Sequence, residues 1–158
     1  MMSTSTATPT LTSLKTGHIG LNVTDLERSQ AFYERLLGLS VAAEGSDDDR
    51  RWVFLGRDGA LVVTLFQQSK GTFSTSTPGL HHLSFQVEDM EQVHAAEAIA
   101  HELGAPFFHE SVVAHSEGSS SGGIFFADPD GIRLEVYAPH GAEDAPAPSG
   151  EAPTCGFF

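Results

Sequence analysis

The stretch HIGLNVTDLE at residues 18–27 returns as HLSFQVEDME at residues 82–91, at a constant offset of 64. Four positions are identical (His, Val, Asp and Glu), and the apolar positions exchange among Ile, Leu, Phe and Met. Polar and apolar residues alternate along both segments, which is the pattern of a half-buried strand. Side chains two apart share a face of a strand, which groups His18 with Asn22 and His82 with Gln86. The chain is therefore predicted to contain two copies of one supersecondary unit.

Each predicted strand is followed by a helix with recognisable ends. Asp25 and Asp89 are suited to cap the helix N-termini, and apolar residues then recur at helical spacing. Gly38 and Gly104 are suited to end the two helices. Three strand-like runs follow in each half, at residues 39–44, 51–56 and 60–66 and at residues 106–114, 123–127 and 131–138.

These patterns predict an α+β domain over residues 17–140, built from two βαβββ modules at residues 17–70 and 80–140. A unit of about 60 residues is marginal alone, so the two modules are expected to share one core. Residues 1–16 and 141–158 are rich in small and polar residues without periodicity, and we predict both to be disordered tails. The Gly118–Gly123 run predicts either a mobile lid or a flexible surface connection.

The composition excludes several classes of partner. The 158 residues include 8 Lys and Arg against 21 Asp and Glu, for a formal net charge of −13. Nucleic acids and anionic membrane surfaces bind clusters of cations, so neither is an expected partner. The sequence contains no apolar run long enough to span a membrane and no secretory signal. Its single cysteine, Cys155, excludes an internal disulfide. We therefore expect a cytoplasmic protein whose partner is a small-molecule substrate.

Three residues at strand positions form a candidate metal site. Duplicated strands can meet around a pseudo-twofold axis, which would bring His18 and His82 together. Glu135 is the only acidic residue of the last predicted strand and shares a face with Arg133 and Tyr137. Two imidazoles and one carboxylate bind Fe(II) with open positions for substrate and O₂, and the same set can hold Mn²⁺, Ni²⁺ or Zn²⁺. The alternative is that each His is structural and that Arg133 neutralises Glu135.

The chain resembles the vicinal oxygen chelate superfamily, the group of glyoxalases, bleomycin-resistance proteins and extradiol dioxygenases, over about residues 15–140. The resemblance rests on HIGLNV-x-DL at residues 18–26, FY-x3-LGL at 32–39, HLSF-x-V at 82–87 and F-x-DPDG-x3-E at 126–135. It implies that the paired βαβββ modules form a cupped mixed sheet with a divalent metal in the cup. It also implies a homodimer.

The resemblance places the metal positions of the family on His18, Thr64, His82 and Glu135. Thr64 departs from the pattern, because glyoxalases and the related epimerases carry Glu or Gln there and a hydroxyl is a poor ligand. The remaining His-His-Glu set is the pattern of ring-cleaving dioxygenases and fosfomycin thiol transferases. Two positions depart from the dioxygenases, since Phe125 stands where they keep a Tyr, and Gln67 or Gln68 stands where they keep a His of the distal pocket.

We therefore expect a metal-dependent enzyme acting on a small oxygenated molecule, with an Fe(II) dioxygenase-like reaction as the leading hypothesis. The alternatives are lyase, isomerase or thiol-transfer chemistry at Mn²⁺, Ni²⁺ or Zn²⁺, and a small-molecule binding protein of the bleomycin-resistance kind. His115 and Tyr137 are the candidate catalytic residues, with His115 as acid or base. The residues expected to contact substrate are Asn22, Thr64, Gln86, Phe125 and Arg133.

Overall fold

The computed structural model describes residues 10–156 and 158, and it contains the two predicted βαβββ modules. Module one consists of β1 (Ile19–Val23), α1 (Leu26–Leu37), β2 (Ser40–Asp47), β3 (Arg50–Arg57) and β4 (Ala60–Gln67). Module two consists of β5 (Leu83–Gln86), α2 (Met90–Glu102), β6 (Val113–Ala114), β7 (Gly122–Ala127) and β8 (Arg133–Ala138), followed by a short 3₁₀ helix, η1 (Thr154–Gly156). The predicted α+β fold class is confirmed.

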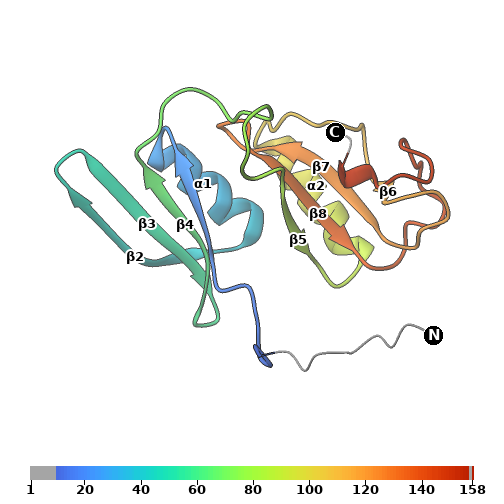
Figure 1. Ribbon diagram of the computed structural model, residues 1–158, viewed down its shortest axis with the longest axis horizontal. Coiled ribbons are helices and arrows are strands. Elements are labelled where there is room, and N and C mark those ends of the chain that lie inside the picture. Colours follow the sequence, from blue (N-terminus) through green and yellow to red (C-terminus); the bar gives the residue numbers. More distant parts are fainter. Residues whose placement is uncertain (1–9, 157) are drawn as a thin grey trace, which may run out of the picture.

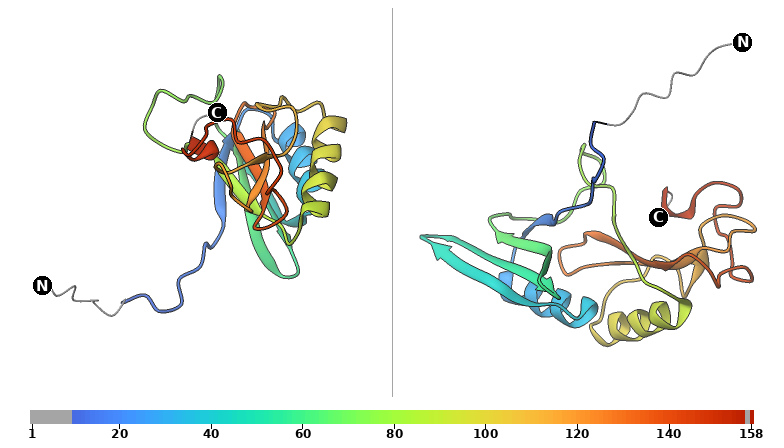
Figure 2. Two further views of the ribbon diagram at one scale, coloured as in Figure 1. Left: turned by 90° about the vertical axis from the view of Figure 1, so that its right-hand side faces the viewer. Right: turned by 90° about the horizontal axis from the view of Figure 1, so that it is seen from below.

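Each module has its own four-stranded mixed sheet, with strand orders β1-β4-β3-β2 and β5-β8-β7-β6. The first and last strands of each module pair in parallel, and Gly20 lies opposite Thr64 as Ser84 lies opposite Glu135. The sheets lie next to each other with α1 and α2 on the same side of them (Figure 1; Figure 2). The opposite faces of both sheets carry the candidate site residues.

The helix caps confirm the sequence prediction. The side chains of Asp25 and Asp89 accept hydrogen bonds from the backbone N–H groups of Arg28 and Gln92, each at 3.0 Å. Gly38 ends α1 in the left-handed conformation, at φ 63°, which costs glycine little because it has no Cβ. The second helix has Leu103 as its C-cap, in the right-handed conformation, and the predicted Gly104 follows it at φ 72°.

One apolar core joins the two modules. Buried residues of both modules belong to a single cluster, for example Leu21, Phe32 and Val63 with Val93 and Leu134. This arrangement is the expected one for two units that are too small to bury sufficient surface separately.

The turn after β7 carries a buried polar link between the modules. The Asp128 carboxylate accepts hydrogen bonds from the backbone N–H groups of Asp130 (2.9 Å) and Ile132 (2.8 Å) within the turn. It also accepts one from the Tyr33 hydroxyl of α1, at 2.8 Å. Each of these bonds satisfies a carboxylate that would otherwise be costly to bury.

One segment differs from the strand predictions. The predicted strand at residues 106–114 is reduced to β6, with one isolated bridge between Phe107 and Phe126. Residues 1–9 of the predicted N-terminal tail lie outside the described residues, and residues 10–16 are exposed without helix or strand. In the described part of the chain, no helix combines the length and apolar character that crossing a membrane requires.

The segment after β8 differs from the predicted disordered tail, because residues 141–156 lie against module two. The N–H of Ala142 donates to the carbonyl of Ser120 at 2.9 Å. Thr154 donates from its N–H to the carbonyl of His115 and from its hydroxyl to the carbonyl of Ala114, both at 2.7 Å. Backbone bonds and two small buried residues hold the segment, and such anchors leave no periodicity in the sequence.

Candidate metal and acid–base site

Glu135 is the buried carboxylate at the centre of the site. It projects from β8 with 3% of its side chain exposed. Its Oε1 lies 2.5 Å from Nε2 of His115, and its Oε2 lies 3.4 Å from Nε2 of His82. An isolated carboxylate at this depth would cost several kcal/mol, so the two imidazoles are its compensating partners.

His115 is held in one orientation by hydrogen bonds at both ring nitrogens. An ionised carboxylate only accepts, so Nε2–H of His115 donates to Glu135. Nδ1 of the ring lies 2.8 Å from the Ser121 hydroxyl, within hydrogen-bond distance. The backbone N–H of His115 also donates to the carbonyl of Ser121, at 3.0 Å. The Gly118–Gly123 run therefore contains a support for His115.

His82 lies immediately before β5 and is half-buried. Burial lowers the pKa of its imidazole, although the nearby Glu135 carboxylate opposes the shift. Its Nδ1 lies 2.8 Å from Nδ1 of His81. A neutral imidazole is the form that binds metals, so this environment favours the ligating state of His82.

The spacing of His82 and Glu135 fits two ligands of one metal ion. Ligand atoms bound at about 2.0–2.2 Å to one ion lie roughly 3 Å apart when they are at right angles. The 3.4 Å between His82 Nε2 and Glu135 Oε2 is close to that separation and long for a hydrogen bond. The donor set therefore suits a divalent cation, with one nitrogen and one carboxylate supplied by module two.

Arg133 does not neutralise Glu135, contrary to the alternative drawn from the sequence. Its guanidinium carbon lies over the rings of Phe108 and Phe158, at 5.7 and 5.3 Å from their centroids. The two carboxylate oxygens of Glu135 are contacted by His115 and His82 instead. Arg133 thus lies beside the site as a cation among aromatic rings.

Three further predicted residues share the face of sheet two that carries Glu135. The hydroxyl of Tyr137 donates to the side-chain carbonyl of Gln86 at 2.9 Å, and its ring centroid lies 5.0 Å from that of His115. Phe125 lies opposite Glu135 in the strand register and is fully buried. The Tyr137–Gln86 pair therefore lines the site, whereas Phe125 is fully buried beneath its surface, with its ring against that of Phe158.

The predicted residues of module one lie apart from this group. His18 is exposed just before β1, and the amide oxygen of Asn22 accepts from Gln68 at 2.9 Å. Thr64 is 1% exposed, and its hydroxyl donates to the carbonyl of Ile19 at 3.4 Å. Across residues 10–156 and 158, no three His, Cys, Asp or Glu side chains are grouped so as to hold a metal ion. Within one chain, His18 therefore does not join His82 and Glu135.

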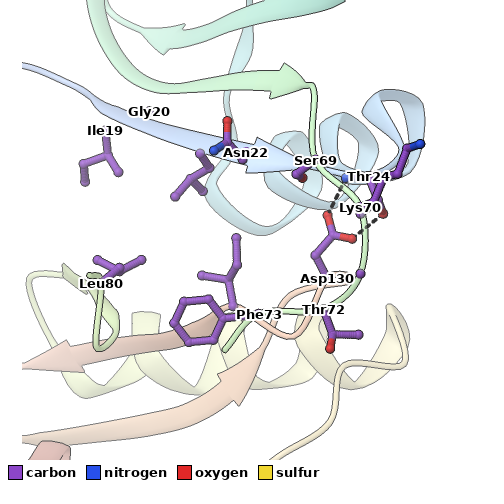
Figure 3. Close-up of a pocket in the computed structure, with 13 residues that line it drawn as sticks. Ile19, Gly20, Asn22, Thr24, Ser69, Lys70, Thr72, Phe73, Leu80 and Asp130 are labelled. Carbon is purple, nitrogen blue, oxygen red and sulfur yellow. Dashed lines mark hydrogen bonds between the residues drawn. The ribbon is translucent and has the colours of Figure 1, made fainter. Parts of the chain in front are cut away.

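A cavity of about 320 Å³ lies beside β1 (Figure 3). Ile19, Asn22, Phe73 and Leu80 are among the residues that line it. The Asp130 carboxylate at its rim accepts hydrogen bonds from the hydroxyl and the N–H of Thr24 (Figure 3). It is also paired with Arg28 at 2.9 Å. The cavity thus leaves space beside Asn22. The carboxylate of Asp130 at its rim is already engaged by Thr24 and Arg28.

The sequence did not indicate three residues that belong to the site. Ser121 supports His115, and Phe158 packs against His82 with ring centroids 5.5 Å apart. Burial raises the pKa of the Cys155 thiol, and the charge of Glu135 adds to that effect. Cys155 and Phe158 lie in the segment predicted to be disordered. Only Ser121, in the Gly118–Gly123 run, lies in a segment that the sequence had singled out.

The arrangement combines two donor groups suited to a divalent metal with an adjacent imidazole. His82 and Glu135 provide one nitrogen and one oxygen donor, and two protein ligands leave further coordination positions open. His115 lies within hydrogen-bond reach of Glu135 and is oriented by Ser121. Such a site can chelate an oxygenated molecule and move a proton beside it.

The family profile described as Glyoxalase/Bleomycin resistance protein/Dioxygenase superfamily matches residues 15–136. Catechol-2,3-dioxygenase of Bacillus subtilis (strain 168) is 26% identical over 125 residues, which cover 77% of this chain but 40% of the dioxygenase. The Escherichia coli (strain K12) protein YaeR, which is described as uncharacterized, is 32% identical over 125 residues. That match covers 76% of this chain and 92% of YaeR.

A solved structure has the same fold over most of the chain. The glyoxylase/bleomycin resistance protein/dioxygenase domain from Frankia sp. EAN1pec superposes with a TM-score of 0.70 at 26% identity, covering 80% of this chain and 98% of that one. The profile match spans both modules, from before His18 to beyond Glu135. The chain therefore belongs to the glyoxalase/bleomycin resistance protein/dioxygenase superfamily.

Proposed function

We propose that the protein is a metal-dependent enzyme that acts on a small oxygenated organic molecule by an Fe(II) dioxygenase-like reaction. The observation that carries the proposal is Glu135, a buried carboxylate whose two oxygens are contacted by imidazoles and not by Arg133. Divalent metals are bound within this superfamily. Similarity to a catechol-2,3-dioxygenase supports the choice of reaction class.

The proposed metal ligands are His82 and Glu135 of one chain and His18 of the partner subunit. His18 is exposed just before β1 and is separate from the other two in its own chain. A homodimer in which each module one faces the partner's module two would complete two equivalent sites. These residues would hold a divalent ion, which would supply Lewis-acid chemistry toward vicinal oxygens of the substrate and, as Fe(II), redox chemistry toward O₂.

The remaining residues of the site would handle the proton and orient the substrate. His115 shares its Nε2 proton with Glu135 and can pass it to or from a substrate hydroxyl. The contact of Ser121 with Nδ1 holds the His115 ring in its orientation. The Tyr137 hydroxyl and the Gln86 amide, joined at 2.9 Å, offer hydrogen bonds to substrate oxygens on the same face of the sheet.

Elemental analysis of protein purified without chelators tests the metal requirement. We expect one Fe, Mn, Ni or Zn ion per chain in the wild type and none in H82A or E135A. H94Q is the matched control, because His94 is a largely exposed histidine of α2 paired only with Glu97. A wild type that neither contains nor takes up a divalent ion contradicts the proposal.

Oxygen consumption against a panel of catechols tests the reaction class. We expect O₂ uptake that depends on added Fe(II) and is lost in E135A. Turnover of a vicinal-oxygen substrate without O₂ would assign the site to lyase, isomerase or thiol-transfer chemistry instead.

Mixing two inactive variants tests the shared site. H18A and E135A each remove a ligand, so neither homodimer retains a complete set. In a heterodimer, one site would combine His18 of the E135A chain with His82 and Glu135 of the H18A chain. Statistical exchange then restores about a quarter of the sites. If the ligands all came from one chain, the mixture would recover no metal binding.

A further inference from the structure

The ring of Phe158 occupies an aromatic slot directly beside the candidate metal ligands. We define this aromatic slot by His82, Phe108, Phe125 and Arg133. The ring centroid of Phe158 lies 4.8 Å from that of Phe125, 5.1 Å from Phe108 and 5.5 Å from His82. All three contacts are tilted or edge-on, which are the favourable geometries for aromatic pairs at this separation. The slot is therefore shaped for one aromatic ring.

The slot also contains a cation. The guanidinium carbon of Arg133 lies 5.3 Å from the Phe158 ring centroid, within the distance of a cation–π interaction. Among the described residues, the ion pairs within 4.0 Å do not include Arg133. Arg133 therefore places a cation beside the site with no carboxylate within ion-pair distance among the described residues. An anionic group on a bound ring would supply that partner.

The chain segment that carries Phe158 is anchored separately from the slot. Thr154 is fully buried and donates to the carbonyls of His115 and Ala114. Ala142 is also buried and donates to Ser120. These bonds hold the segment near the site whether or not the Phe158 ring is in place. The ring can therefore leave while its tether stays bound.

We propose that this aromatic slot is a binding site for a monocyclic aromatic carboxylate and that Phe158 is its built-in competitor. A ligand ring would replace that of Phe158 against His82, Phe108 and Phe125, and its carboxylate would pair with Arg133. The inference rests on the proposed function only in placing such a ligand beside the metal ligands, since the slot itself requires no metal. Only a ligand that binds the slot tightly enough to displace the Phe158 ring would then occupy it.

The competition predicts a specific effect on affinity. A ligand that binds only when the slot is open has an apparent affinity equal to its intrinsic affinity multiplied by the fraction of molecules whose slot is open. If the Phe158 ring leaves the slot open about a tenth of the time, its removal tightens ligand binding about tenfold. Removing the Arg133 charge weakens the same ligand, because both the ion pair and the cation–π contact are lost.

Calorimetric titration of chelator-treated protein with benzoate and with cyclohexanecarboxylate tests the proposal. We expect F158A to bind benzoate about tenfold more tightly than the wild type. We expect F158A/R133Q to bind it at least about threefold more weakly than F158A. E151Q is the matched control, because Glu151 is an exposed residue of the same segment, and its affinity should equal that of the wild type. Cyclohexanecarboxylate should bind F158A several-fold more weakly than benzoate.

The proposal is overturned if F158A and the wild type bind benzoate equally or if neither binds it. It is also overturned if cyclohexanecarboxylate binds as tightly as benzoate, since the slot would then not select an aromatic ring. Metal content, measured in parallel on F158A loaded with Fe(II), keeps this outcome separate from the proposed function. An F158A protein that binds one metal ion per chain but no benzoate would refute the slot alone.

Discussion

The two modules place their strands in the same register and yet differ in chemistry at equivalent positions. Gly20 pairs with Thr64 in module one, and Ser84 pairs with Glu135 in module two. The offset of 64 between Gly20 and Ser84 makes Thr64 the counterpart of Glu135. Both side chains are buried, but one is a hydroxyl that donates to its own sheet and the other a carboxylate that is hydrogen-bonded to His115 and lies 3.4 Å from the imidazole of His82.

The histidines that begin the two units differ in the same way. His18 is exposed, whereas His82 is half-buried beside Glu135. The segment after β8 lies against module two (Figure 2), whereas the connection after β4 lies beside β1 and lines the cavity there. The repeat thus retains the residues that fold each unit, while the buried carboxylate and the imidazoles that contact it all belong to module two. The corresponding imidazole of module one, that of His18, is exposed.

Removing Glu135 is expected to have the largest effect of any single change. E135A deletes the only carboxylate of the proposed ligand set, and we expect divalent-metal affinity to fall at least about 100-fold, or about 2.7 kcal/mol. T64V makes the equivalent change in module one and should alter affinity less than about threefold. Titration calorimetry with Mn²⁺ measures both. Equal losses in the two variants would show that the modules contribute alike, against the asymmetry described above.

The chain has two tyrosines, one in each module, which allows a second comparison. The Tyr33 hydroxyl is buried and donates to Asp128, whereas that of Tyr137 donates to Gln86 at a more exposed position. Y33F leaves a buried carboxylate without one partner, so we expect the free energy of unfolding to fall by about 2 kcal/mol. Y137F should lower it by less than about 1 kcal/mol. Urea denaturation at pH 7 measures both values.

The stability that Tyr33 contributes should also depend on pH. Burial raises the pKa of Tyr33 well above its usual range, and the charge of Asp128 adds to the shift. The unfolded chain releases the tyrosine proton at about pH 10 while the folded chain retains it. The contribution of Tyr33 to stability is therefore complete below about pH 10 and is lost as the pH rises further. We expect the stability gap between wild type and Y33F to narrow from pH 9 to pH 11, and a constant gap would contradict this account.

The fold could be predicted from the sequence because its determinants are local and repeated. Strand alternation, the capping Asp25 and Asp89, and the terminal Gly38 each act within a few residues. The metal-site prediction was less complete, because whether His18 meets His82 depends on how the modules are placed and not on either module alone. The contacts of Phe158 and Thr154 join segments distant in sequence through backbone bonds and aromatic packing, and no periodicity indicates such contacts.

Adding a carboxylate to module one tests whether the two modules form one site. T64E places the family's usual ligand type opposite Gly20. If His18 and residue 64 of one chain face His82 and Glu135 of the partner subunit, the new carboxylate joins an existing site. We then expect metal affinity to rise about tenfold, or about 1.4 kcal/mol, at an unchanged stoichiometry of one ion per chain. Calorimetry gives both quantities, and two ions per chain would instead show that each module forms its own site.

The smallest expected effect concerns a feature in which the modules should be equal. Asp25 and Asp89 cap α1 and α2 with the same bond, a carboxylate accepting the N–H three residues later at 3.0 Å. Replacing an N-cap Asp by Ala typically costs about 1 kcal/mol, so D25A and D89A should each lower the free energy of unfolding by that amount in urea denaturation. Glu88 precedes the second cap and is exposed, which makes E88A the control with no expected change. A loss confined to one variant would mean that the repeated sequence no longer makes equal contributions to folding, whereas equal losses would restrict the difference between the modules to their site faces.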